Sequence, residues 1–210
     1  MKRFIVTGTD TGLGKTVFAA ALTSALKGIY WKPVQAGHSF DFGSGGETDS
    51  EVVARLSGRP VLPELYRLKL AAAPHKAAAA EGIRINPAKL VLPKTGAPLI
   101  VEGAGGLMVP LNHSTLYIDV FARWKAPLIL CARTSLGTIN HTLLSLEAIR
   151  ARKVPLLGIA FIGEANEDST RIICKLGNAK RLGRLPRVFP LTAKKLAKAF
   201  AAGFALKDFR

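Results

Sequence analysis

The stretch that decides the fold is Gly8-Thr9-Asp10-Thr11-Gly12-Leu13-Gly14-Lys15-Thr16, close to the beginning of the 210-residue chain. The apolar run Phe4-Ile5-Val6 precedes it, and a helix-like segment that starts at Val17 follows it. A strand, a glycine-rich turn, Lys-Thr and a helix are the context in which this pattern forms a phosphate-binding loop. Five residues separate Gly8 from Gly14, one more than in the standard pattern, so the loop is a longer variant. The sequence therefore predicts a nucleotide-binding α/β fold.

The residue types in this loop suit the binding of a magnesium nucleotide. Backbone N–H groups in the turn and the positive end of the following helix dipole attract phosphate oxygens. Lys15 adds a mobile cation for the β- and γ-phosphates, and the Thr16 hydroxyl can ligate Mg²⁺. The alternative, a glycine-rich strand–helix turn with an exposed lysine, is disfavoured because the motif and its context agree. The expected ATP-binding residues of the loop are Gly12, Leu13, Gly14, Lys15, Thr16 and Val17.

Length and composition are those of one domain that spans residues 1–210. At 49% hydrophobic residues, a chain of this length buries about 70% of the surface that its unfolded form exposes. No apolar run approaches the ~18 residues that a membrane span needs, and the N-terminus lacks a cleavable signal pattern. Cys131 and Cys174 lie far apart, without the spacing of metal ligands. These features favour a reduced, cytoplasmic protein with no membrane partner.

The net charge of +16 is concentrated near the C-terminus, where residues 169–210 hold eleven Lys or Arg and a single acid, Asp208. A basic tail of this kind can bind nucleic acid. Here the cations are interleaved with Leu, Ile and Phe, and no aromatic RNA-binding motif accompanies them. We therefore expect a solvated basic face that attracts anionic substrates in general, and no nucleic-acid partner.

Apolar runs and helix-like segments alternate along the chain, as they do in α/β domains. The expected strands are Arg3–Thr7, Ile29–Lys32, Ala97–Val101, Leu128–Ala132 and Leu156–Phe161. The last three are almost wholly apolar, as strands buried on both faces of a parallel sheet are. The expected helices are Lys15–Leu26, Glu51–Leu56 with Thr48 as its cap, Leu70–Glu81 beyond Pro74, Leu116–Trp124, Asn140–Ala151 and Ala193–Ala202. The prediction is a single-domain P-loop fold with a mostly parallel central sheet flanked by helices.

Polar residues follow several of the predicted strands, and in such sheets ligands bind beyond the carboxyl ends of the strands. Lys32 closes one predicted strand, Glu102 closes another, and residues 134–140 follow a third. Mg²⁺ prefers hard oxygen ligands, so Thr16, Asp49 and Glu102 are the candidate metal ligands. Simpler roles stay open at this point: Lys32 as a strand lysine that reaches solvent, Asp49 as an acid at a helix start, and Glu102 as a loop acid.

Five segments of the chain together resemble the dethiobiotin synthetase family. They are Gly8–Thr16, Trp31–Gly37, Ala73–His75, Val101–Gly106 with Pro110, and Leu136–Thr142. The phosphate loop alone would indicate only a nucleotide-binding superfamily. Its combination with Lys-Pro-Val, Glu-Gly-Ala-Gly-Gly and Leu-Gly-Thr-Ile-Asn-His is highly specific. The resemblance covers about residues 4–190.

Members of this family convert 7,8-diaminopelargonate, CO₂ and ATP into dethiobiotin, ADP and phosphate. The resemblance implies that one amine of the substrate takes up CO₂ as a carbamate, which then attacks the γ-phosphate. The second amine attacks the resulting carbamic–phosphoric anhydride and closes a cyclic urea. By the same resemblance, Lys15 and Lys32 are the catalytic residues that flank the carbamate and the γ-phosphate.

The resemblance assigns further residues to the metal, the nucleotide and the substrate. It implies Mg²⁺ at Thr16, Asp49 and Glu102, and additional nucleotide contacts at Gly103, Ala104, Gly105, Leu185 and Pro186. In this family the distant carboxylate of the substrate is held by backbone amides at a helix start of the other subunit, which implies a homodimer with shared active sites. The implied substrate contacts are Thr11, Lys32, Leu136, Gly137, Thr138 and Asn140.

Two positions depart from the family pattern. Ala36 stands where members often carry Ser or Thr, so a hydroxyl contact to the substrate is absent and water or Gln35 is left to substitute for it. Ile162-Gly163 stands where members often read adenine with an Asn-Asp pair, although Gly183–Pro186 keeps the later nucleotide-loop pattern. The prediction of phosphate binding is therefore stronger than that of a preference for ATP.

Two other protein classes have a related loop. Partition and cell-division switch ATPases carry a signature lysine near the start of the loop, where this chain has Asp10, and they leave Lys32 unexplained. Cobyrinate-type amide synthetases normally add a glutaminase domain, for which we expect no room in this chain. The prediction is a synthetase of the dethiobiotin type, with the partition-type switch ATPase as the alternative.

Overall fold

The computed structural model describes residues 2–37 and 46–209. The strands in these residues are β1 (Arg3–Gly8), β2 (Ile29–Trp31), β3 (Val34–Ala36), β4 (Val61–Leu62), β5 (Tyr66–Leu68), β6 (Leu99–Gly106), β7 (Leu128–Arg133), β8 (Leu156–Ile162) and β9 (Arg181–Leu185). The α-helices are α1 (Lys15–Ala25), α2 (Asp49–Ser57), α3 (Pro74–Ala80), α4 (Tyr117–Trp124), α5 (Thr138–Ala151), α6 (Glu167–Leu176) and α7 (Ala193–Gly203). The predicted alternation of strands and helices is therefore confirmed.

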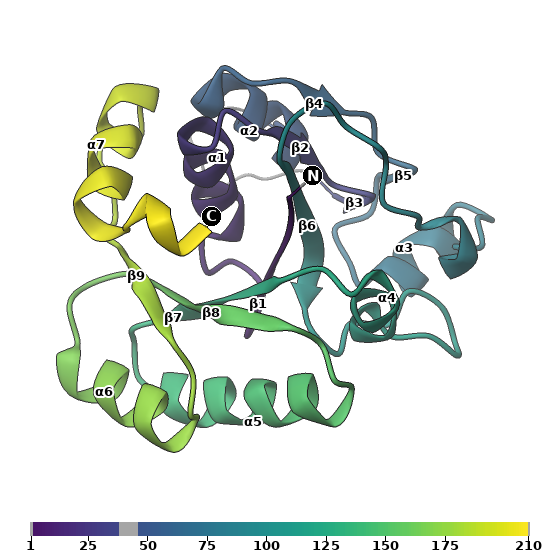
Figure 1. The fold of residues 1–210 in the computed structure, drawn as a ribbon. Helices are drawn as coiled ribbons and strands as arrows, with labels where there is room; N and C mark the ends of the chain where they lie inside the picture. Colours follow the sequence, from purple (N-terminus) through teal and green to yellow (C-terminus); the bar gives the residue numbers. More distant parts are fainter. Residues whose placement is uncertain (1, 38–45, 210) are drawn as a thin grey trace.

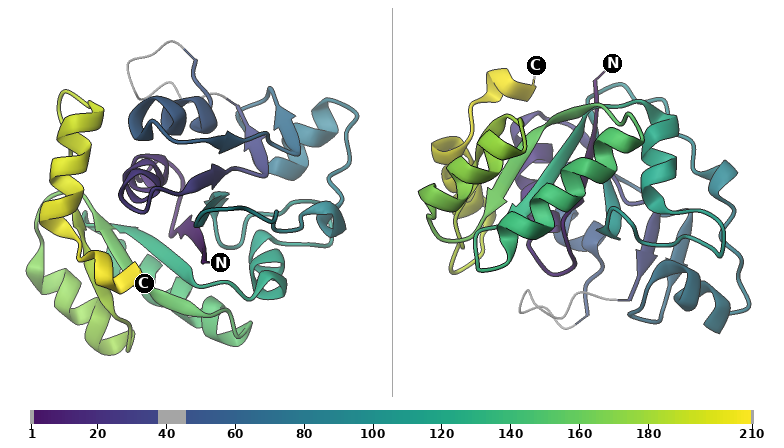
Figure 2. Two further views of the ribbon diagram at one scale, coloured as in Figure 1. Left: turned by 45° about the horizontal axis from the view of Figure 1, so that its top comes forward. Right: turned by 90° about the horizontal axis from the view of Figure 1, so that it is seen from below.

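The described strands form one seven-stranded parallel sheet in the order β4-β2-β6-β1-β7-β8-β9, and β3 pairs with β5 beside it. The helices α1, α2 and α7 lie on one side of the main sheet, and α5 and α6 lie on the other (Figure 1). Figure 2 shows α5 and α6 side by side beneath the strands. This arrangement confirms the predicted α/β fold with a parallel central sheet flanked by helices.

The central strand β1 is buried on both faces, as its apolar sequence predicts. Phe4 and Val6 pack with residues of α1, α2 and α7, whereas Ile5 packs with residues of α4, α5 and α6. This division follows from the strand itself, because successive side chains point to opposite faces. The two cores therefore hold the β1 carboxyl end, and the loop that follows it, in a fixed place.

Helix α1 begins where the phosphate loop ends, because Gly14 adopts a left-handed conformation with φ of 98°. An L-residue rarely adopts that conformation, which glycine enters at little cost. A Cβ atom at Gly14 would also lie 3.1 Å from Cγ2 of Ile162 at the end of β8. The glycine therefore brings the phosphate loop close to the neighbouring strand end.

Helix α2 begins with the capping box that Thr48 and Glu51 make. The Thr48 hydroxyl accepts from the Glu51 backbone N–H at 3.3 Å, and the Glu51 carboxylate accepts from the Thr48 N–H at 2.7 Å. Such caps satisfy helix N–H groups that have no partner within the helix. The predicted cap is confirmed, and it fixes Asp49 as the first residue of the helix.

Two features of the fold differ from the sequence-based expectation. Strand β6 continues to Gly106, so Glu102 lies within the strand and does not close it. The strands β3, β4, β5 and β9 and the helix α6 were not predicted. The first three are only two or three residues long, too short to show a period, and β9 contains Gly183, which has weak strand propensity.

In the part of the chain that the structure describes, no helix combines the length and the apolar composition that crossing a membrane requires.

Candidate functional site

A cavity of about 1690 Å³ opens at the carboxyl ends of the parallel strands. The phosphate loop forms one end of it, and the segment after β9 forms the other. Most of the site residues predicted from the sequence line this cavity. They are Thr11, Gly12, Leu13, Gly14, Lys15, Thr16, Val17, Lys32, Asp49, Glu102, Ala104, Gly105, Leu185 and Pro186.

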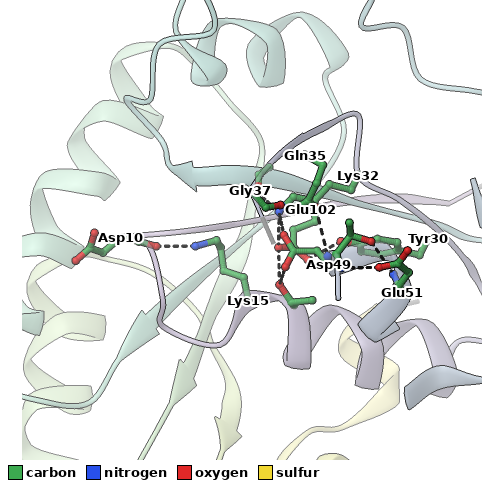
Figure 3. Close-up of polar contacts among 12 residues, drawn as sticks. Asp10, Lys15, Tyr30, Lys32, Gln35, Gly37, Asp49, Glu51 and Glu102 are labelled. Carbon is green, nitrogen blue, oxygen red and sulfur yellow. Dashed lines mark hydrogen bonds and ion pairs between the residues drawn. The ribbon is translucent and has the colours of Figure 1, made fainter. Parts of the chain in front are cut away.

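Lys15 lies over the phosphate loop with its side chain almost wholly buried. Its ammonium donates a hydrogen bond of 2.6 Å to the backbone oxygen of Asp10, which curls the side chain back over the loop (Figure 3). Burial lowers the pKa of Lys15, and the nearby Glu102 carboxylate offsets only part of that effect. The ammonium is therefore incompletely compensated, and a nucleotide phosphate supplies the kind of charge that it lacks.

Lys32, Asp49 and Glu102 form a largely buried cluster next to the phosphate loop (Figure 3), and Thr16 contacts both of its carboxylates. Nζ of Lys32 lies 2.5 Å from Oδ2 of Asp49 and 3.0 Å from Oε1 of Glu102. The Thr16 hydroxyl lies 3.0 Å from both Oδ1 of Asp49 and Oε1 of Glu102. Hard oxygen atoms from α1, α2 and β6 therefore converge on one point, as the sequence predicted.

Lys32 is 4% exposed, so its charge depends on its partners. Burial alone would lower the pKa of Lys32, but Asp49 and Glu102 together outweigh it and raise that pKa above the ordinary lysine value. Lys32 also donates to the backbone oxygen of Gly103 at 3.3 Å. The suggestion that Lys32 is a strand lysine reaching solvent is therefore wrong: it is a buried cation between two carboxylates.

Tyr30 belongs to this cluster, although the sequence-based reasoning did not identify it. Its hydroxyl donates a hydrogen bond of 2.8 Å to Oε2 of Glu102 (Figure 3). Burial and the Glu102 carboxylate raise the pKa of Tyr30 well above the ordinary value, so the phenol stays protonated and donates. The available signal was its spacing: Tyr30 lies two residues before Lys32, and alternate residues of a strand share a face.

Gln35 lines the cavity next to Ala36 and also joins two segments of the chain. Its amide nitrogen donates to the Gly37 backbone oxygen at 2.8 Å, and its amide oxygen accepts from the Asp49 backbone N–H at 3.3 Å. Both ends of the side chain are therefore used to join the segment after β2 to the start of α2. That water or Gln35 substitutes for the missing Ala36 hydroxyl stays a prediction.

The other end of the cavity is lined by backbone and apolar groups together with polar side chains, among them Glu164 and Arg187. Ile162 and Gly163 form its wall after β8, and the Arg184 guanidinium donates to the Gly163 backbone oxygen at 2.8 Å. Asn166 also lines this end, but its amide donates to the Thr134 backbone oxygen and caps α6 by accepting from Ser169. The amide that could read a base edge is thus already used to support the fold.

Several predicted site residues do not meet the cavity in this chain. Among the described residues that line it, none comes from residues 136–140, and Gly103 contributes only its contact with Lys32. Leu136 is fully exposed, whereas the buried Thr138 hydroxyl donates to the Arg133 backbone oxygen at 2.5 Å. The start of α5 therefore presents Leu136 and Gly137 outward, away from the cavity of its own chain.

Comparison with known proteins places the chain among close relatives. A family profile described as "AAA domain" matches residues 2–195. A protein of Rhodopseudomonas palustris (strain TIE-1) named ATP-dependent dethiobiotin synthetase BioD is 62% identical over 99% of this chain and 96% of its own length. A protein of the same name from Brucella melitensis biotype 2 (strain ATCC 23457) is 57% identical over the same shares.

Solved structures with a similar fold are much more distant in sequence. The cell division ATPase MinD of Pyrococcus furiosus superposes with a TM-score of 0.56 at 14% identity, covering 95% of this chain and 97% of that one. A ParA family ATPase of Chlorobium tepidum TLS gives 0.54 at 14% identity, covering 96% and 91%. At this level of identity the likeness shows the fold alone.

Proposed function

The chain belongs to the ATP-dependent dethiobiotin synthetase family, and we propose that it closes the cyclic urea of dethiobiotin from 7,8-diaminopelargonate and CO₂ while ATP becomes ADP and phosphate. The observation that carries this proposal is the buried Lys32 between Asp49 and Glu102, next to the phosphate loop. A nucleotide switch needs the cations of its phosphate loop. A reaction that joins two anions needs an additional cation outside the loop, and Lys32 is placed to supply it.

The chemistry requires two anions, a carbamate and the γ-phosphate, to meet. Two like unit charges about 4 Å apart repel by about 4 kcal/mol at an effective dielectric constant near 20. Lys15 at the loop and Lys32 at the carboxylate cluster lie on the same cavity and can neutralise this charge from two sides. Positioning and charge neutralisation are the main contributions that phosphoryl transfer needs from a protein.

The reaction balances in three steps. An amine of the substrate attacks CO₂ and loses a proton to solvent, which gives the carbamate. A carbamate oxygen attacks the γ-phosphorus, and the bond from that phosphorus to the bridging oxygen of ADP breaks. The second amine attacks the carbamate carbon and loses a proton to solvent, the bond from that carbon to the phosphate oxygen breaks, and phosphate leaves as the ring closes. We assign charge neutralisation in these steps to Lys15 and Lys32, and contact with the carbamate to Thr11.

The oxygen cluster suits Mg²⁺. A hydroxyl and two carboxylates are hard donors, which Mg²⁺ combines with water and phosphate oxygens. Thr16, Asp49 and Glu102 would hold the ion, and when bound it would neutralise charge on the β- and γ-phosphates. Lys32 contacts both of these carboxylates and would share them with the ion.

A homodimer would complete the substrate site. The fully exposed Leu136 at the α5 start and the 57% exposed Leu144 on the same helix support a partner on this face. The Gly137–Asn140 backbone of one subunit would then bind the distant carboxylate of a substrate held in the other.

Mixing an inactive Lys32→Gln subunit with an inactive Gly137→Asp subunit should restore up to about a quarter of the activity, because about half of the dimers are mixed and each mixed dimer has one intact site of two. No recovery after subunit exchange would contradict shared sites.

The test of the proposed reaction is the substrate dependence of phosphate release. We expect purified protein with Mg²⁺ and ATP to release phosphate at a substantial rate only when diaminopelargonate and bicarbonate are both present, with one dethiobiotin formed per phosphate. Equal release without either substrate would identify an ATPase and contradict the synthetase. We expect the preference for one nucleotide base over another to depend on the far end of the cavity.

A further inference from the structure

Tyr30 joins two neighbouring strands through Glu102. Tyr30 is fully buried on β2 and pairs in register with Ile100 on β6, so Glu102 lies two residues further along the same strand. Because alternate strand residues share a face, Glu102 projects from the face of the sheet on which Tyr30 packs. The hydrogen bond of 2.8 Å from the Tyr30 hydroxyl to Glu102 follows from this register.

The two oxygens of Glu102 have different partners. Oε2 accepts from Tyr30, while Oε1 faces Nζ of Lys32 and the Thr16 hydroxyl, each at 3.0 Å. The last torsion of a glutamate side chain is broad and roughly two-fold, so rotamer preference alone does not hold the carboxylate plane. The Tyr30 bond holds Oε2 and thereby helps to keep Oε1 directed toward Thr16 and Lys32.

We infer that Tyr30 is a positioning residue that orients the Glu102 carboxylate for Mg²⁺ in the nucleotide complex. This inference rests on the proposed function, because it assumes that Glu102 ligates the metal of ATP. Hydrogen-bonding partners of metal ligands set the orientation of those ligands, and their loss typically lowers metal affinity by about 10–100-fold. Tyr30 never touches the ion or the substrate, and its effect passes through Glu102.

The test compares Tyr30→Phe with Tyr117→Phe. Tyr117 is also fully buried, and its hydroxyl is among the buried polar atoms without a hydrogen-bond partner in the described part of the structure. Each variant therefore loses one buried hydroxyl, but only one of them loses the contact with Glu102. Mn²⁺ binding is measured by electron paramagnetic resonance on protein saturated with a non-hydrolysable ATP analogue, and melting temperatures report folding.

We expect Tyr30→Phe to bind Mn²⁺ about tenfold more weakly or worse, and Tyr117→Phe to bind it like the wild type. The Mg²⁺ concentration for half-maximal turnover should rise in the same proportion for Tyr30→Phe, while kcat at saturating Mg²⁺ changes little. Unchanged Mn²⁺ affinity in Tyr30→Phe, or an equal loss in Tyr117→Phe, would overturn the inference.

A second measurement keeps the inference testable if Tyr30→Phe folds poorly. In a Glu102→Gln background the hydroxyl of Tyr30 no longer orients a charged ligand, so adding Tyr30→Phe should cause no further loss of Mn²⁺ affinity on the folded fraction. An equal additional loss there would show that Tyr30 acts through the general structure. If the wild type does not bind Mn²⁺ with nucleotide and does not form dethiobiotin, the proposed function is wrong. If the wild type does both and only the difference between the variants is missing, the proposed function stands and the inference about Tyr30 is wrong.

Discussion

The two ends of the cavity differ in the groups that line them and in how far these groups are buried. At the phosphate end, Lys15, Lys32 and Glu102 are 6%, 4% and 1% exposed, and their charged atoms are held by short contacts. At the far end, Phe189 on the segment after β9 is 93% exposed, and Gly163 offers the cavity only its backbone. One end therefore presents buried charges at fixed points, and the other presents a more open wall of backbone, apolar and polar groups.

This difference has a consequence for specificity. A site that hydrogen-bonds a group of its ligand rejects analogues that lack the group far more strongly than an apolar site does. The phosphate end should therefore be strict about the anions it joins, and the far end should tolerate changes of base. The following predictions test each half of that contrast.

The largest effect is expected for Lys15→Ala at the phosphate end. The variant loses the loop cation from nucleotide binding and from the transition state, so the rate should fall on the order of 10²-fold or more. The control is Lys195→Ala, because Lys195 contacts the Phe189 backbone oxygen near the far end and is exposed. Steady-state dethiobiotin formation measures both. Near-normal activity in Lys15→Ala would remove the phosphate loop from the account.

Lys32→Gln should lower turnover per folded molecule by roughly 10²-fold or more while ATP affinity is largely kept. The fold should lose stability as well, because removing one member of a buried ion pair costs about 3–5 kcal/mol. We expect the melting temperature to fall by roughly 6–20 °C, since 1 kcal/mol shifts a domain of this size by about 2–4 °C.

Added Mg²⁺ separates the two roles of Lys32. Without the ammonium, Asp49 and Glu102 repel each other, so a divalent cation should raise the melting temperature of Lys32→Gln more than that of the wild type. Turnover should not recover with it. Full activity per folded molecule at saturating Mg²⁺ would make Lys32 a structural residue only.

At the far end, replacing ATP by CTP or GTP should change turnover by no more than about tenfold. Ile162-Gly163 offers no amide or carboxylate to read the base, and the Asn166 amide is engaged by backbone groups. Rates at saturating nucleotide, with Mg²⁺ held constant, measure this tolerance. A strict requirement for ATP would mean that a base-reading contact exists at this end.

The smallest effect distinguishes the two buried lysines by pH. Burial lowers the folded-state pKa of Lys15 below that of the unfolded chain, so its charge destabilises the fold at neutral pH and the cost fades as pH rises toward 10.5. Lys15→Met should therefore be slightly more stable than the wild type at pH 7, with an advantage that shrinks as the pH rises.

For Lys32 the effect of pH on stability has the opposite sign. Its pKa is raised by Asp49 and Glu102 against the effect of burial, so its contribution to stability is complete below pH 10.5 and is lost as pH rises above that value.

Urea unfolding of the nucleotide-free protein between pH 7 and 10 measures the stability difference between Lys15→Met and the wild type. An advantage of Lys15→Met that grows with pH would contradict this assignment.

The sequence predicted the phosphate end of the cavity better than it predicted the far end. Charged atoms at fixed points require particular residue types, so Gly8–Thr16, Lys32 and Glu102 could be placed before the fold was known. Tyr30 was missed because its role depends on the register of β2 against β6, which a sequence alone does not display. The far end is formed mostly by loop residues after β8 and β9, whose placement leaves little sequence signature beyond Ile162-Gly163.

The most direct test of the account follows one oxygen atom. The wild-type protein is supplied with ¹⁸O-labelled CO₂, unlabelled water, diaminopelargonate and MgATP, and the released phosphate is analysed by mass spectrometry before CO₂ exchanges its oxygen. If a carbamate oxygen attacks the γ-phosphorus, each phosphate carries one ¹⁸O atom from CO₂. Phosphate without the label would mean that water attacks ATP, as in a nucleotide switch, and would contradict the proposed reaction.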